Sequence, residues 1–336
     1  MLASFESLLG RLARKGTETA KRTSVAEAEK TPTSIRLKPQ TKHFIDHQAE
    51  ALGTSAQAVI NMILDGVAET SMDSTAGALR TIRERFFFVF QAHKFDLPGI
   101  VSVMKPHGFR LSDLDNPSRL LDLIDQASIQ HIAQTFFVQP EWVSGVSAWP
   151  VRTESIDTRW YKNVHSVAKR LMAYHQQGLK PHVMFLRRER ANFVAARADN
   201  DKTDAHQEPV GVVVRLRRTT SDGLEFTVYE TWEFERWSYW RCREQLKLLI
   251  AFCDQARDLV TSAGYELPED KLDGLRTGRT LAAIALDRVG TVGWFPDDYA
   301  SLREEVTQEA ADWPAVKDAY IKGKYDDIIA DARRNR

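Results

Sequence analysis

The alternation of polar and apolar residues in "TPTSIRLKPQ", residues 31–40, predicts one short strand. Ile35 and Leu37 fall on one face of this strand, and Arg36 and Lys38 fall on the other. The next strand-like stretch lies far downstream, so the backbone N–H and C=O groups of this strand have no partner nearby in the chain. We therefore expect its partner to come from elsewhere.

Two stretches of helical period follow this strand. The segments "QTKHFIDHQAEAL" and "AQAVINMILDGVAET" carry apolar residues three and four positions apart. Gly53 is expected to end the first helix, and Thr54 or Ser55 to cap the second. The pattern thus predicts a strand–helix–helix domain over 32–70, preceded by a flexible basic segment over 1–31.

The helical period continues through the next part of the chain and predicts a bundle over 78–150. Its expected helices, separated by the loop signals "PHG" and "DNPS", cover 78–94, 97–106, 117–125 and 127–138. The aromatic stretch "RFFFVF" within this region is expected to lie in its core.

The period changes beyond residue 158. A helical stretch precedes three strand-like runs, "HVMFLRRE", "PVGVVVRLRRTT" and "LEFTVYETWEFERW", and a long helix that Gly264 is expected to stop follows them. The loop "ARADNDKTDAHQE" between the first two runs is polar. This order predicts an α+β domain over 158–265 with a three-stranded antiparallel meander, and residues 266–336 form a helical tail. The predicted fold class is mainly α with an α+β C-terminal domain.

Composition places few further limits on the protein. Its 336 residues are 43% hydrophobic and 27% charged with a formal net charge of +0, so no overall field directs the chain to nucleic acid. Cys242 and Cys253 lie on one expected helix, too far apart for a disulfide, which favours a reducing compartment. No apolar run is long enough to span a membrane, and we expect a cytoplasmic protein without a membrane partner.

Residues 32–70 resemble a ribbon–helix–helix domain of the MetJ/Arc-like DNA-binding family. The resemblance rests on "SIRLKPQTKHFIDHQAEALGTSAQAVINMIL", with its alternating strand, proline, glycine turn, small cap residue and second helix. It implies a homodimer or higher oligomer, in which two copies of the strand pair as a ribbon that enters the major groove of double-stranded DNA. The second copy would then supply the missing partner strand.

The resemblance also assigns residues to the DNA. Ser34 and Arg36 face the base edges, whereas Lys38, Thr54 and Ser55 lie near phosphates. Pro32 stands where many members of the family have a third base-reading side chain, so two readers remain in each strand.

Residues 80–147 are similar to a lambda-repressor-like helical bundle, through "LSDL" and "HIAQTFFVQPEWVSG". The segment "RLSDLDNPSRLLDLID" is net acidic and would repel phosphate. We interpret this bundle as structural or as a partner site.

The segment "YETWEFERWSYW" contains a candidate ligand pocket at Tyr229, Trp232 and Trp237. The alternative is a sheet face packed against the long helix. By element order alone, this domain is similar to PAS- or GAF-like sensory modules.

No catalytic, metal or cofactor signature is found, and we expect no enzyme. His43 and His47 stand at a spacing that could hold a metal, but a third ligand is missing, so a solvated face is the better interpretation. The favoured hypothesis is a dimeric, sequence-specific transcriptional regulator with an effector or protein partner at its C-terminal part. The alternative is a plasmid partition, relaxosome accessory or antitoxin-type protein whose C-terminal part docks a protein partner.

Overall fold

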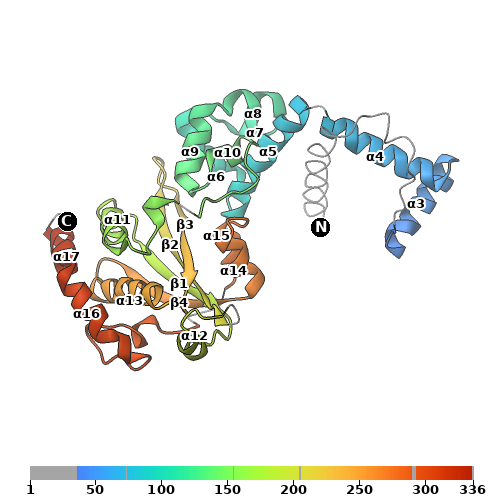
Figure 1. Ribbon diagram of the computed structural model, residues 1–336. Helices are drawn as coiled ribbons and strands as arrows, with labels where there is room; N and C mark the ends of the chain where they lie inside the picture. The colour runs from blue at the N-terminus through green and yellow to red at the C-terminus, as the bar shows by residue number, and fades with distance from the viewer. Residues whose placement is uncertain (1–35, 73, 154, 204–205, 290–292, 335–336) are drawn as a thin grey trace. The chain divides into compact units, whose positions relative to one another are not determined.

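The computed structural model describes residues 36–72, 74–153, 155–203, 206–289 and 293–334 (Figure 1). The chain divides into two compact units, Met1–Thr81 and Ile82–Arg336. Each unit is described by itself. Most of the described elements are helices, and the second unit also contains one four-stranded mixed sheet. This content agrees with the predicted fold class, mainly α with an α+β part.

The described part of the first unit is a helical hairpin of α3 (Pro39–Leu52) and α4 (Ala56–Met72). Gly53 ends α3 in the left-handed conformation with φ 63°, as its position predicts. The N–H of Thr54 bonds to the carbonyl of Ala49 at 2.9 Å, and the hydroxyl of Ser55 accepts from the N–H of Ala58 at 3.1 Å. Both predicted helices and their turn are therefore confirmed.

The strand predicted before α3 falls largely outside the described residues, and Ser34 is among those not described. Residues 36–38 belong to no strand in the described chain. Lys38 has an extended backbone, with φ −65° and ψ 150°, and directly precedes Pro39 at the first position of α3.

The second unit begins within α5 (Ser74–Ala92), which crosses the boundary between the units. The helices that follow confirm the expected pattern, with bounds α6 (Leu97–Met104), η1 (Lys105–His107), α7 (Leu111–Leu114), α8 (Pro117–Leu123), α9 (Gln126–Phe136) and α10 (Pro140–Val143). Asp96, Asn116 and Asp125 cap α6, α8 and α9 through their side chains. Phe86, Val89 and Phe90 are fully buried, as expected for "RFFFVF", whereas Phe88 of the same stretch is 42% exposed.

The sheet contains β1 (His182–Arg188), β2 (Pro209–Thr219), β3 (Glu225–Arg236) and β4 (Thr261–Leu267). Its order is β3-β2-β1-β4, with β1, β2 and β3 antiparallel and β4 parallel to β1. The predicted meander is thus confirmed, but the three-stranded sheet is wrong because a fourth strand completes it.

The prediction that Gly264 stops the long helix is wrong as well. Helix α13 (Trp240–Gln255) ends earlier, and Gly264 lies inside β4. A Cβ at Gly264 would come within 2.5 Å of the carbonyl oxygen of Trp294, which packs against the strand there. Gly264 therefore allows the chain at Trp294 to pack closely against strand β4, where a larger residue would clash.

Helices cover both faces of the sheet (Figure 1). One face packs on α11 (Val164–Gln176) and α13 within a large apolar cluster that also includes the bundle. The other face packs on α14 (Glu269–Arg276) and α15 (Ala282–Ala285). The remaining elements are η2 (Ile156–Thr158), α12 (Phe193–Asp199), η4 (Pro296–Asp298), η5 (Ala310–Asp312), α16 (Trp313–Lys322) and α17 (Tyr325–Arg334).

Two local predictions need correction. Helix α12 occupies part of the segment predicted as a polar loop, because Asn192 caps it by accepting from the N–H of Ala195 and Phe193 is buried. The tail beyond residue 266 is helical only in part, since β4 extends to Leu267 and 3-10 turns interrupt the rest. The predicted subdivision of the second unit into 78–150, 158–265 and 266–336 stays a prediction.

Candidate functional site

The predicted DNA contacts that the structure describes are all exposed. Arg36 and Lys38 precede α3, and Thr54 and Ser55 lie in the turn before α4. Because Ser55 caps α4 through the N–H of Ala58, its hydroxyl is engaged while the first backbone N–H groups of the helix remain oriented toward solvent. The structure brings Thr54 and Ser55 together at one helix N-terminus.

The hairpin of the first unit buries few apolar side chains. Ile45, Ala49 and Val59 form its buried cluster, with Leu37, Ala56 and Ile60 packed around them. Five large apolar side chains of the same two helices are 44% to 59% exposed: Phe44, Leu52, Met62, Ile63 and Leu64. We call this set the apolar surface of the hairpin.

The three aromatic residues predicted as a ligand pocket do not lie together. Trp232 is fully buried in the main cluster, and its Nε1 donates to Glu230 at 2.7 Å. Trp237 is also fully buried and stacks on Phe193, with ring centroids 4.1 Å apart. Tyr229 packs on the opposite face, against the cluster of α14 and α15.

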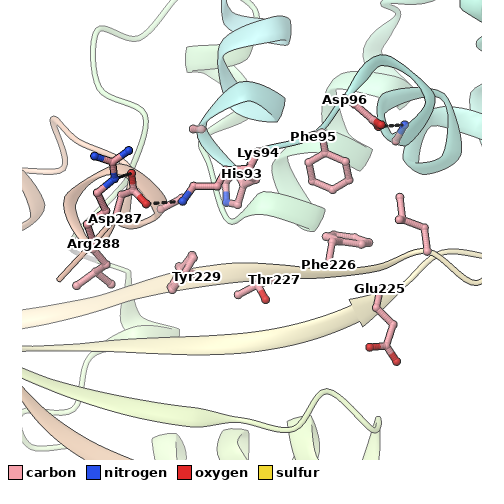
Figure 2. Close-up of a pocket in the computed structure, with 15 residues that line it drawn as sticks. His93, Lys94, Phe95, Asp96, Glu225, Phe226, Thr227, Tyr229, Asp287 and Arg288 are labelled. Carbon is pink, nitrogen blue, oxygen red and sulfur yellow. Dashed lines mark hydrogen bonds and ion pairs between the residues drawn. The ribbon is translucent and has the colours of Figure 1, made fainter. Parts of the chain in front are cut away.

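Tyr229 instead lines an open cavity of about 720 Å³ beside β3. Figure 2 shows the side chains around it, which come from the connection between α5 and α6, from the first half of β3 and from the chain after α15. The residues that line it include His93, Lys94, Phe95, Asp96, Leu224, Glu225, Phe226, Thr227, Tyr229, Ala283, Leu286, Asp287 and Arg288.

His93 lies on the bundle side of this cavity. Its Nδ1 is 2.8 Å from the carbonyl oxygen of Val89, so Nδ1 carries the proton and Nε2 is left as an acceptor. Its ring lies 4.7 Å from that of Phe136 and 6.4 Å from that of Tyr229. Burial lowers the pKa of His93 to about 4, which keeps the imidazole neutral at pH 7.

Lys94 and Asp287 form an ion pair at one end of the cavity (Figure 2). The hydrogen bond from Lys94 lowers the pKa of Asp287, and burial raises the pKa of Tyr229. Lys94 has a left-handed backbone, φ 63°, which turns the chain sharply out of α5 toward the cap at Asp96. His93, Lys94 and Asp287 were not predicted from the sequence; the polar pair His-Lys, which interrupts the apolar stripe just before this cap, was the available signal for the first two.

Two buried ionic clusters lie elsewhere in the second unit. The Glu230 carboxylate accepts from Arg170, from the Tyr174 hydroxyl at 2.8 Å and from Trp232. In the other cluster, Arg243 and Lys247 of α13 contact Asp312, at 2.8 and 3.3 Å. Because these groups bond mainly to one another, we interpret both clusters as structural.

Within the described residues, no group of three or more His, Cys, Asp or Glu side chains could hold a metal ion. No helix in the same part of the chain is both long and apolar enough to cross a membrane. Cys242 and Cys253 are buried and free, and burial raises the pKa of both thiols.

The fold therefore defines a helical protein with one mixed sheet, an open cavity at the edge of that sheet, and a helical hairpin with an exposed apolar surface. No protein-family model, curated protein or solved structure matches the chain.

Proposed function

We propose that the protein is a cytoplasmic, dimeric, sequence-specific DNA-binding protein that regulates transcription through a ribbon–helix–helix domain. The apolar surface of the hairpin carries this proposal. Two helices that bury three apolar residues and expose five larger ones do not enclose a core sufficient for an independent fold. A second copy of the same hairpin would cover this apolar surface with an identical apolar surface.

The same dimer provides a partner for the predicted strand over 32–38. Two copies pair antiparallel, which satisfies their backbone groups and makes a two-stranded ribbon of the width that the major groove accepts. Arg36 and Ser34 would then face base edges, with Arg36 bonding to guanine O6 and N7 in a bidentate manner. The exposure of Arg36 is consistent with this role.

Phosphate binding would fall to the N-terminus of α4 and to Lys38. Helix α4 begins at Ala56 with its cap at Ser55 in place, and the helix dipole favours a phosphate at this end. These contacts would hold the ribbon in register, whereas Arg36 would read the sequence.

The experiment compares Arg36→Ala with the wild-type chain on duplexes that the wild type selects from a random library. We expect Arg36→Ala to lose about tenfold or more of its preference for the selected sequence over a scrambled one, because a bidentate contact contributes ~1–3 kcal/mol. The control Arg334→Ala removes the same charge from an exposed position of α17 and should keep the full preference. Equal, sequence-independent binding by all three proteins would contradict the proposal.

A further inference from the structure

The two halves of strand β3 differ in how their outer edge is covered. Among the strands that the structure describes, β3 pairs with β2 alone and is therefore an edge of the sheet. The register shifts between Thr231 and Phe234, and within this bulge the indole of Trp160 donates to the carbonyl of Glu233 at 2.7 Å. The backbone N–H of Tyr161 also donates to the Glu233 carboxylate, at 2.9 Å. The edge is therefore covered at Glu233.

The first half of β3 is open. The N–H of Thr220 bonds to the carbonyl of Leu224 at the hairpin, and bonded pairs then alternate along the two strands. Thr227 stands opposite Arg217, whose own N–H bonds to Leu179 on the other side of β2. The pair of Thr227 and Arg217 is thus a non-bonded pair, and the N–H and C=O of Thr227 point outward.

By the same alternation, the backbone groups of Glu225 and Tyr229 also point outward. Among the described residues, none bonds to the outer backbone groups of Thr227 or Tyr229. Glu225, Thr227 and Tyr229 line the cavity of about 720 Å³, together with the neighbouring Phe226 of the same strand. The cavity therefore presents a short run of free strand edge together with side-chain walls.

The two walls of the cavity differ in chemistry. One is apolar, where the ring of Phe95 lies 5.2 Å from that of Phe226 with Leu224 nearby. The other wall carries Lys94, Asp287 and Arg288, an excess of one positive charge. Two further carboxylates of the lining lie at the aromatic end: Asp96, which accepts from the N–H of Gly99, and Glu225. Figure 2 shows these charged groups at one end and the aromatic pair toward the other.

We infer that the open half of the β3 edge binds an extended peptide of a protein partner as an added strand, with apolar and acidic side chains in alternation. Each second residue of such a peptide would bond to the outer groups of Thr227 and Tyr229. Its apolar side chains would meet Phe95 and Phe226, and its acidic ones would meet Lys94 and Arg288.

This inference goes beyond DNA binding and does not depend on it, because every residue involved belongs to the unit Ile82–Arg336. The probe is the capped peptide acetyl-Leu-Glu-Val-Glu-Val-amide, measured by titration calorimetry with the full chain. We expect saturable binding, with hydrogen-exchange protection confined to 222–232. N-methylation of alternate residues of the peptide should weaken binding by about tenfold, because the methyl groups remove hydrogen bonds to the edge.

The matched protein variants are Thr227→Pro and Thr227→Val. Proline removes the outward N–H and leaves the ladder to β2 intact, so affinity should fall about tenfold, whereas valine keeps the N–H and should bind as the wild type does. If Thr227→Pro fails to fold, Arg288→Glu is used in its place, because the Arg288 side chain is 92% exposed. This variant should bind the acidic peptide more weakly than the wild type does. The inference is overturned if the peptide does not bind, if every variant binds equally, or if 222–232 becomes protected by raising protein concentration alone.

Discussion

Burial lowers the pKa of His182 to about 4, and a second histidine with the same shift, His93, also makes the stability of the second unit depend on pH. Its pKa is about 4 in the folded protein, against 6.5 for an ordinary histidine, because burial against Phe136 and Tyr229 disfavours the imidazolium. Between these two values the unfolded chain takes up a proton that the folded protein does not. Stability is therefore complete above about pH 6.5 and decreases as the pH falls toward 4.

We expect His93→Gln to reduce this pH dependence. At 1.36 kcal/mol for each unit of pKa, His93 accounts for up to about 3 kcal/mol of the loss between pH 7 and pH 4. The free energy of unfolding is measured with urea at pH 7 and pH 4.5. Tryptophan fluorescence follows the second unit, since all 8 tryptophans lie beyond residue 81. The control His206→Gln, at an exposed position, should lose as much stability between the two pH values as the wild type does. An equal loss in all three proteins would refute the role given to His93.

At the scale of elements, buried ion pairs and hydrogen bonds connect helix α13 to the segment that contains η5. Lys247 is fully buried, and its Nζ lies 2.9 Å from the Glu309 carbonyl oxygen and 3.3 Å from the Asp312 carboxylate. Arg243, one turn earlier on α13, bonds to the same carboxylate at 2.8 Å. Removing one cation leaves buried negative charge without full compensation.

Lys247→Met should therefore lower the free energy of unfolding by about 3–5 kcal/mol, because methionine fills the volume but leaves the carboxylates short of a partner. The control is Lys322→Met, whose partner Asp318 is exposed like itself, and it should cost less than about 1 kcal/mol. Both values come from urea unfolding at pH 7. If Lys247→Met lowers the free energy of unfolding no more than the control does, the ionic cluster does not stabilise the contact between α13 and the η5 segment.

The elements that the sequence predicted well follow local rules. Gly53 ends α3, Ser55 caps α4, and α8 begins at Pro117 within the loop signal "DNPS". Strand β4 was missed because its pairing with β1 joins residues about 80 positions apart, such as His182 and Thr261, and no local pattern encodes such a contact.

The candidate site was predicted less well, for the same reason. Tyr229 lines the cavity, but Trp232 and Trp237 were grouped with it on aromatic content, although strand alternation sends Trp232 to the opposite face. The cavity joins His93, Tyr229 and Asp287 from three distant segments. Nothing near any one of them in the sequence indicates the other two.

At the scale of the whole molecule, the two units depend on different sources of stability. The unit Ile82–Arg336 contains a continuous apolar cluster that runs through the bundle, the sheet and the last two helices. The hairpin of α3 and α4 buries only Ile45, Ala49 and Val59 among its apolar residues in the described chain. If a second copy supplies the rest of its core, its stability must follow protein concentration by mass action.

Thermal unfolding should then show two transitions that respond differently to concentration. The loss of helical circular dichroism from α3 and α4 should move to higher temperature as the protein concentration is raised roughly a hundredfold, since dimerisation stabilises only the folded hairpin. Tryptophan fluorescence, which reports residues 142–313 alone, should not move. Ile63→Glu, at an exposed position of the apolar surface, should abolish the dependence of the first transition on concentration. A fluorescence transition that shifts with concentration in Ile63→Glu as in the wild type would place the dimer contact in the second unit and contradict an intermolecular ribbon.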